Sequence, residues 1–381
     1  MATNNETIRV PVSFMAIDPY IERHIPSPVE RNIPGKNMVE WGENNAFANY
    51  LLELSQEAPT LRSIIGGTVD FICGDGCTIA PIEESYGEGT MNTRGDIIAA
   101  QVRDVATDLE TYGGFALQVI RSKSGEIVEV YYIDIRFLRC NKENTVFYYS
   151  EKWGRPGKRD TIVYPAFMRF TPDMWAGLTD EQRAFHSSSI VYVKNNHTQT
   201  YPLPVYCAAL KACETERAIA DYHLNAINNC FTSSMIINFN AGRPTDEAKE
   251  ELERQVNEKF SGTSNAMRIM LSFNEGKENA TTIEAPKVED FGERYKALSQ
   301  SVRQQQFTAF RANPNLFGIP TENLGFSQEE YEAAFRLYNR TVVRPAQRLI
   351  CDAYDRIYGK PGVLTITPFS MEETATEKQV N

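Results

Sequence analysis

The sequence predicts an α+β fold, because the spacing of its apolar residues changes from helical to strand-like and back again. Apolar residues recur three and four apart from Trp41 to Leu109, and again after Pro204. Between residues 113 and 195 they form short β-branched or aromatic runs, several of which are separated by turn residues. We therefore expect an antiparallel meander of strands attached to helices.

Composition limits the class of protein. With 381 residues, the chain is long enough for two or three domains of roughly 150 residues each. Its 39 basic and 50 acidic residues give a net charge of −11, which is unsuited to gripping nucleic acid over the whole surface. An odd number of cysteines, seven, indicates a reducing compartment. No secretory signal or membrane-spanning run is recognisable, so we expect a cytoplasmic type of protein.

The first half of the chain contains an arm, helices and strands. Residues 1–40 carry prolines at positions 11, 19, 26, 28 and 34, so we expect an extended arm without folded elements. Helical spacing predicts three helices, the second ending before the run Cys73-Gly-Asp-Gly-Cys77. The predicted strands cover residues 115–120, 127–133, 145–149, 161–167 and 189–193.

The second half predicts two long helices around a small α/β module. The first helix, 205–231, follows Pro204, and its apolar stripe consists of Ala220, Leu224, Ile227 and Phe231. Residues 232–287 contain predicted strands at 234–239, 268–273 and 281–284, and a helix opened by Thr245. The second helix, 288–311, carries a stripe of Phe291, Tyr295, Leu298 and Val302.

The last part of the chain contains a break, a long helix and a closing strand. The break covers 312–327 and is rich in Asn, Pro and Gly. The helix that follows should kink at Pro345, which lacks the N–H that would bond to Thr341. Residues 328–369 hold this helix and a strand at 363–366, and 370–381 form a polar tail.

Motifs for catalysis and cofactor binding are not found in the sequence. There is no P-loop, no paired histidine motif and no nucleophile elbow. Cys73 and Cys77 have zinc-like spacing but no second pair, and two small half-buried residues explain them better. Paired glutamates such as Glu250 and Glu251 are best explained as solvated helix faces. We therefore predict no enzyme activity, no metal and no cofactor.

Four arginines form a stripe along the long C-terminal helix. Arg336, Arg340, Arg344 and Arg348 recur every four residues, away from the apolar side. The stripe is suited to contacting phosphates or the carboxylates of a neighbouring subunit. A solvated face interspersed with acidic residues is the alternative interpretation, because the helix has equal numbers of acidic and basic residues.

Four motifs occur in a recognisable order. Residues 41–76 combine an Asn/Tyr/Leu helix, an Ala-Pro, a second helix and Gly74-Asp-Gly76. Residues 109–133 combine a helix end, a glycine pair and a two-strand hairpin, and residues 260–271 have Phe-x-Gly, Asn-Ala and an apolar strand. Residues 307–325 contain Phe317-Gly-Ile-Pro320 and Leu324-Gly325, and a helix with an Arg-Pro follows. Together they resemble the portal proteins of tailed bacteriophages.

The resemblance implies a portal-type fold for residues 41–369. Its parts would be a wing (41–204 and 328–369), paired stem helices (205–231 and 288–311), a clip (232–287) and a tunnel loop (312–327). The short C-terminus implies a reduced or absent crown. Portals are dodecameric rings at one capsid vertex, through which double-stranded DNA is packaged and ejected. Implied partners are the major capsid protein, the large terminase and the neck or adaptor proteins. The implied location is the virion, and the host cytoplasm during assembly.

The resemblance also assigns candidate contact residues. In the tunnel loop, Phe317 and Ile319 should anchor on the wing because apolar loop residues are usually buried. Thr321, Glu322, Asn323 and Leu324 are the candidates to face the channel, unless 312–327 is only a connector. In the clip, the acidic residues Asp246, Glu247, Glu250 and Glu251 are candidates to contact a partner or a neighbouring subunit. The arm should reach a neighbouring subunit or the capsid.

Two other classes of protein stay open on the sequence alone. One is another phage head–tail assembly protein, although an α/β module between two long helices disfavours it. The other is a metal-dependent nucleic-acid enzyme that uses paired carboxylates. The size of the particle in solution distinguishes a portal from the enzyme, because a ring is far larger than a monomeric enzyme.

Overall fold

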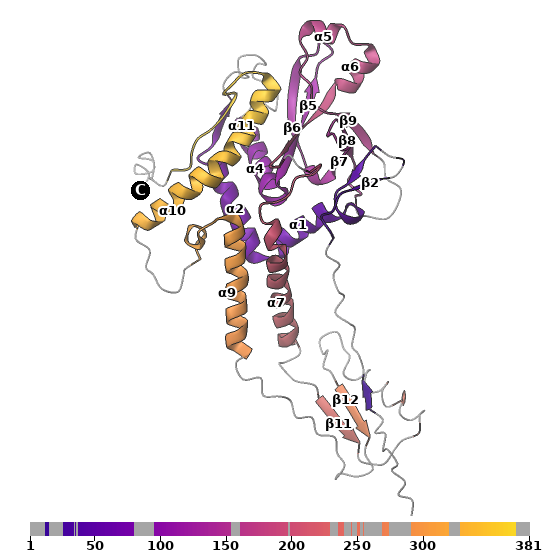
Figure 1. Cartoon of the computed structure of the whole chain (residues 1–381), viewed down its shortest axis with the longest axis vertical. Coiled ribbons are helices and arrows are strands. Elements are labelled where there is room, and N and C mark those ends of the chain that lie inside the picture. Colours follow the sequence, from indigo (N-terminus) through magenta and orange to yellow (C-terminus); the bar gives the residue numbers. More distant parts are fainter. Residues whose placement is uncertain are drawn as a thin grey trace, which may run out of the picture. The chain divides into compact units, whose positions relative to one another are not determined.

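A computed structural model of the chain describes most of its length. The described residues are 12–14, 26–33, 35, 37–79, 95–153, 161–196, 199–228, 235–239, 245, 250–251, 254, 269–273, 291–319 and 328–370. The chain divides into two compact units, and each is described by itself (Figure 1). Unit 1 comprises residues 1–24 and 217–299, and unit 2 comprises residues 25–216 and 300–381.

Three helices form the helical part of unit 2: α1 (Phe47–Glu57), α2 (Pro59–Cys73) and α4 (Gly95–Tyr112). They confirm the helices predicted from apolar spacing. Ala58 separates the first two in an extended conformation, and Pro59 then begins α2, where its missing N–H has no helical partner to lose. Leu54, Leu61 and Val105 are fully buried between these helices.

Two antiparallel sheets pack with these helices. The first has the order β10–β5–β6, formed by β5 (Gly114–Arg121), β6 (Ile127–Ile133) and β10 (Ser188–Lys194). The second contains β7 (Leu138–Cys140), β8 (Val146–Tyr149) and β9 (Ile162–Pro165) in sequence order. The prediction of a single meander is therefore wrong, because β10 returns to pair with β5 instead of extending the second sheet. In the central strand, Leu117 pairs with both Val191 and Tyr132 and is fully buried.

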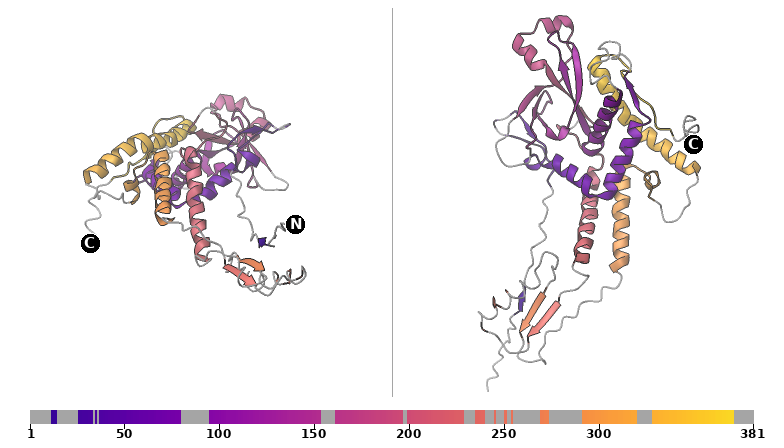
Figure 2. Two further views of the ribbon diagram at one scale, coloured as in Figure 1. Left: turned by 60° about the horizontal axis from the view of Figure 1, so that its bottom comes forward. Right: turned by 180° about the vertical axis from the view of Figure 1, so that it is seen from behind.

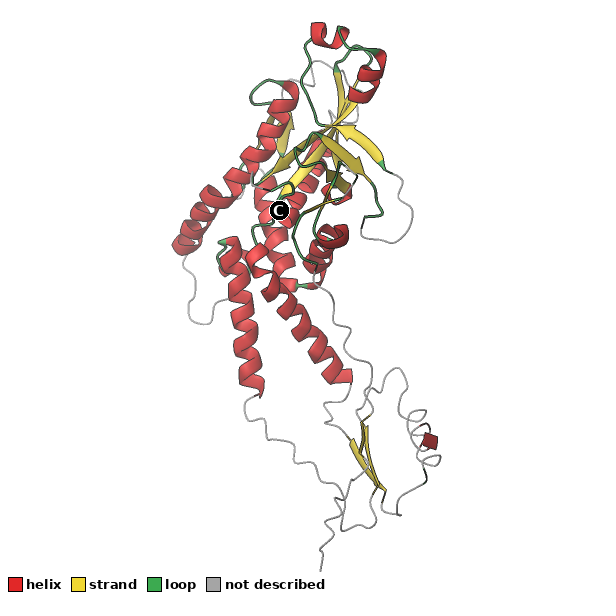
Figure 3. Cartoon of the chain, turned by 45° about the vertical axis from the view of Figure 1, so that its right-hand side comes forward, coloured by secondary structure: helices red, strands yellow, loops and turns green. Residues whose placement is uncertain are grey.

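Two short helices, α5 (Pro172–Ala176) and α6 (Asp180–His186), connect β9 to β10 and lie at the end of these strands (Figures 1 and 3). The spacing of apolar residues did not predict these two helices. Thr171 caps α5, and Thr179 forms a capping box with Gln182 at the start of α6. These caps allow helices of only five and seven residues to form.

The C-terminal part of unit 2 is one long helical segment followed by a strand. It runs through α10 (Gln328–Tyr338), a π-helical turn (Asn339–Val343) and α11 (Arg344–Tyr358). The wide turn ends just before Pro345 and so accommodates the residue that cannot donate to the preceding turn. The final strand, β13 (Leu364–Ile366), is where the sequence predicted it and pairs with β4 (Cys77–Ile79).

Part of the N-terminal arm forms paired strands. Its β2 (Arg31–Asn32) and β3 (Val39–Glu40) pair with each other in unit 2. Glu30 accepts hydrogen bonds from the backbone N–H groups of Thr200 and Tyr201, at 3.1 and 2.7 Å. The expectation of an arm without folded elements is therefore wrong for these residues, because short strands and the hydrogen bonds of half-buried Glu30 give the arm local structure.

Unit 1 contains a three-stranded sheet of order β1–β12–β11, made of β1 (Val12–Phe14), β11 (Met235–Phe239) and β12 (Ile269–Phe273). The last two confirm predicted strands, and they are parallel. A parallel pair needs a crossover connection, and Glu250, Glu251 and Arg254 between them are helical. The arm strand β1 pairs antiparallel with β12, which no sequence signal indicated. The predicted strand at 281–284 lies outside the described residues.

Candidate functional site

Two long helices, α7 (Leu210–Asn228) and α9 (Phe291–Phe310), run side by side where the sequence predicted a helix pair (Figures 1 and 2). In unit 2, Ala212 on α7 and Val302 on α9 belong to one buried apolar cluster. Gln306, fully buried on α9, donates a hydrogen bond to Glu216 on α7 at 2.9 Å. In unit 1 the ring of Tyr222 stacks on Tyr295 with centroids 5.4 Å apart.

The predicted apolar stripes of this helix pair are not all buried within one chain. On α7, Ala220 is exposed and Leu224 is 58% exposed. On α9, Leu298 is 44% exposed, whereas Val302 is buried. Nothing is described for the side chains of Ile227, Phe231 and Phe291. The structure therefore leaves the described leucine of the α7 stripe on the surface of the chain.

The loop after α9 begins with a well-defined helix end. Arg311 takes the left-handed conformation at φ 54°. The N–H of Arg311 bonds to the carbonyl of Thr308, and the N–H of Ala312 to that of Phe307, as in a Schellman motif. Residues Pro314–Phe317 then form a short 3-10 helix that Gly318 ends. The predicted break after residue 311 is confirmed.

Phe317 is the anchor of this loop, as the sequence predicted. Its ring lies 5.9 Å from Phe307 and Tyr338 and 6.1 Å from Phe71, measured between centroids. Gly67 on α2 leaves room for it, since a Cβ there would be 2.7 Å from the ring. Ile319 also packs on the core. The channel candidates Thr321, Glu322, Asn323 and Leu324 lie outside the described residues.

The arginine stripe lies on the exposed side of the C-terminal helical segment. The side chains of Arg336, Arg340, Arg344 and Arg348 are all exposed. Among the described residues no carboxylate lies within ion-pair distance of any of them. Beside them Leu337 is 65% exposed. The face therefore combines unpaired positive charge with apolar surface.

The acidic surface predicted for the module in unit 1 is described in part. Glu250 and Glu251 are exposed, and Glu251 forms an ion pair with Arg254 at 2.7 Å. Asp246 and Glu247 lie outside the described residues. An exposed ion pair of this kind contributes little to stability.

The described part of the chain contains no group of three or more His, Cys, Asp or Glu side chains that could hold a metal ion. Cys73 and Cys77 are half-buried, and burial raises the pKa of both thiols. Their thiols are therefore poorly suited to act as thiolate ligands or nucleophiles. Within the same described residues, no helix is long and apolar enough to cross a membrane.

Comparison with known proteins identifies the family. The phage portal protein family matches residues 100–367, which include most of the mixed helix and sheet fold described above. The chain belongs to the phage portal protein family. It is therefore a structural protein of a phage-type virion, of the kind found at a capsid vertex. Among the classes left open by the sequence, family membership selects the portal proteins.

Solved structures that match this chain come from gene transfer agent particles. They are the neck of the native particle computed with C12 symmetry and the neck of the empty particle computed with C6 symmetry, each with a TM-score of 0.49. A third is the virion of the native particle, with a TM-score of 0.48. Each of the three is 16% identical to this chain. Each match covers 86% of this chain and 86–87% of the other chain. No curated protein matches this chain.

Proposed function

We propose that this chain forms a homo-oligomeric ring at one capsid vertex and that double-stranded DNA passes through the ring during packaging and ejection. The observation that carries the proposal is the exposed apolar surface of the helix pair, with Leu224 and Leu298 at its described positions. Apolar patches that a chain leaves in water mark interaction sites, whereas single exposed leucines do not, and Tyr222 on α7 is also 46% exposed. When neighbours meet head to tail through different faces, a suitable rotation closes a ring.

The ring is tested by placing negative charge on this surface. Leu224→Glu with Leu298→Glu should raise the protein concentration needed for ring formation roughly tenfold or more, because carboxylates would lose water at the interface. Negative-stain electron microscopy and mass measurement would follow assembly. The control is Ser301→Glu with Gln304→Glu, which adds the same charge at exposed polar positions of α9. A wild-type protein without rings, or leucine variants that assemble normally, would contradict the proposal.

In this assignment, α7 and α9 are the stem helices, 232–287 the clip and 312–327 the tunnel loop, and the remainder of 41–369 is the wing. The clip, with its acidic residues Glu250 and Glu251, would contact the large terminase during packaging and the neck proteins afterwards. The wing would contact the major capsid protein. The arginine stripe would meet phosphates or a neighbouring subunit. Subunits would assemble in the host cytoplasm.

Electrostatics agree with a channel through which DNA slides. Duplex DNA carries one negative charge per about 1.7 Å, and each phosphate neutralised by a lysine or arginine adds affinity. A chain of net charge −11 limits that affinity. Phe317, held by three aromatic rings, would fix the base of the tunnel loop while its tip approaches the duplex.

Glu322→Lys with Asn323→Lys should therefore slow or stall DNA passage and leave the ring intact. Two added ammonium groups in each subunit would bind the phosphate backbone where it should slide. A packaging assay at several salt concentrations measures this, and high salt should restore part of the rate. Asn32→Lys with Glu143→Lys, at exposed positions of unit 2, is the control. Normal packaging by the loop variant would remove these residues from the channel.

A further inference from the structure

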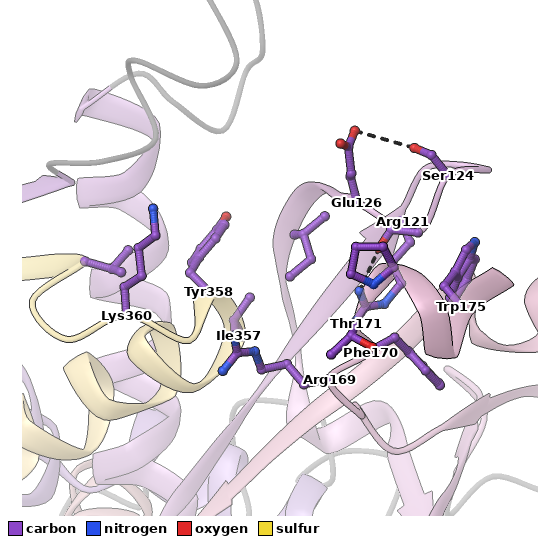
Figure 4. A pocket seen from close by; sticks show the side chains of 14 residues that line it. Arg121, Ser124, Glu126, Arg169, Phe170, Thr171, Trp175, Ile357, Tyr358 and Lys360 are labelled. Atoms are coloured by element: carbon purple, nitrogen blue, oxygen red, sulfur yellow. Dashed lines mark hydrogen bonds between the residues drawn. The ribbon is translucent and has the colours of Figure 1, made fainter. Parts of the chain in front are cut away.

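A pocket of about 300 Å³ lies in unit 2, and no residue of α7, α9 or 312–319 lines it. It is formed by the turn between β5 and β6, the segment leading into α5, and the C-terminal end of α11 (Figure 4). Phe170, Trp175 and Tyr358 supply aromatic walls, and Arg121, Arg169 and Lys360 supply positive charge. No sequence motif indicates these residues as a group, because they come from three distant parts of the chain.

The walls of this pocket are held in place without a ligand. Gly125, at φ 91°, lies against the indole ring of Trp175, where a Cβ would be 2.5 Å away. The indole Nε1 donates to the carbonyl of Lys123 at 3.0 Å. The hairpin turn and α5 are thereby locked together.

Arg121 is a buried cation at the base of the pocket. Only 7% of the residue is exposed. Its Nη atoms donate to the carbonyls of Gly125 and Met168, at 2.9 and 2.7 Å. Its Nε is buried and has no hydrogen-bond partner. Burial lowers the pKa of this guanidinium. A buried charge without a counter-ion is unfavourable, so an anion brought to the pocket would be stabilised.

Two further cations reach the pocket. The guanidinium of Arg169 lies on Gly359 at the C-terminal end of α11, where a Cβ would be 1.9 Å from Cζ. Lys360 follows directly and is exposed. Within the described residues, no carboxylate is within ion-pair distance of Arg121, Arg169 or Lys360. The acidic residue that lines the pocket, Glu126, instead accepts a hydrogen bond from Ser124 at 3.4 Å.

The surroundings favour a protein ligand over DNA. Met168, next to Arg169, is 52% exposed, and Met174 on α5 is 51% exposed. Phe185 on α6 is 45% exposed. Exposed methionine and aromatic side chains beside a cationic pocket are typical of protein interfaces. A DNA duplex presents mainly phosphates and sugars on its outside and offers little apolar surface to cover these side chains.

We propose that this pocket binds a carboxylate side chain of an acidic segment of a partner protein, whose flanking apolar residues cover Met168, Met174 and Phe185. The aspartate or glutamate would enter between Arg121, Arg169 and Lys360, where charge-assisted hydrogen bonds are strongest. The inference does not depend on the proposed ring, because every group of the pocket lies in unit 2.

The test uses the full-length protein and a fluorescent pentapeptide, Gly-Phe-Glu-Phe-Gly, in an anisotropy titration. Arg169→Gln with Lys360→Gln should weaken binding at least about tenfold, the effect of losing one good charge-assisted contact. The matched control is Lys142→Gln with Lys211→Gln, which removes two exposed lysines that do not line the pocket. A peptide with glutamine in place of glutamate should bind at least about tenfold more weakly to the unaltered protein.

Competition separates carboxylate from phosphate. Glutarate should displace the peptide, whereas a short DNA duplex or inorganic phosphate at equal concentration should not. The proposal is overturned if the peptide does not bind at millimolar concentration, or if the glutamine peptide binds equally. It is also overturned if the Arg169→Gln, Lys360→Gln protein binds the peptide as tightly as the control variant does. Displacement of the peptide by the DNA duplex would overturn it too, if the duplex binds this pocket variant more weakly than it binds the control variant.

Discussion

Replacing Arg139 by alanine should destabilise unit 2 by about 3 kcal/mol or more, since several hydrogen bonds to a charged group are lost and a cavity is left. Arg139 is fully buried. Its Nε and Nη2 donate to the side-chain and backbone oxygens of Asn45, at 2.7 and 2.8 Å. Its Nη1 donates to the carbonyls of Arg136 and Leu138, at 2.9 and 2.7 Å.

The position of this guanidinium explains why the effect should be large. It lies 5.5 Å from the ring centroid of Trp41 and 5.0 Å from that of Trp153, so alanine would remove the contacts of the guanidinium with two buried indoles. The Oδ1 of Asn45 also accepts from the N–H of Trp41, at 2.9 Å. Arg139 therefore connects β7 to residues 41–45, which directly follow the arm.

Tryptophan fluorescence during urea unfolding measures the loss, because Trp41, Trp153 and Trp175 account for the chain's three tryptophans and all lie in unit 2. Arg136→Ala is the control: its ion pair with Asp134 is partly exposed and should contribute about 1 kcal/mol or less. An Arg139→Ala protein as stable as this control would show that the buried network is not needed for the fold.

The sequence predicted the long elements well and the long-range connections poorly. Helices such as α2 and α9 repeat their apolar spacing over many residues, so local pattern identifies them. β7 has three residues, and β1 pairs with a strand about 260 residues further along the chain. Pairing of this kind depends on tertiary contacts that leave no local signal.

The candidate sites show the same division. Phe317 was predicted as an anchor because an apolar residue in a polar loop usually packs on the core, and it does. Arg139 gave no such signal, because a charged residue is expected at the surface and its partner Asn45 is 94 residues away. The apolar stripe of α7 was correctly located, but periodicity alone does not say whether the stripe packs within a chain or against another one.

Glu110 on α4 makes unit 2 sensitive to pH in the neutral range. It is 6% exposed, and burial raises the pKa of its carboxyl to about 7 from an ordinary value of 4.5. Neighbouring Asp108 is also buried, and burial together with Asp134 raises its pKa well above normal. Both groups favour the protonated form in the folded state, whereas the unfolded chain releases these protons at lower pH.

The sign follows from proton binding. Between about pH 4.5 and 7 the folded chain holds the Glu110 proton and the unfolded chain does not, so the free energy of unfolding falls as pH rises. The loss through this carboxyl amounts to about 3 kcal/mol at full extent. Glu110→Gln mimics the neutral acid, so the variant should be more stable than wild type at pH 8 by up to that amount and equal to it near pH 4.5. Urea unfolding followed by tryptophan fluorescence across this range measures the difference, with exposed Glu181→Gln as the control. A glutamine variant whose stability parallels that of the wild type at every pH would show that Glu110 is charged in the folded chain.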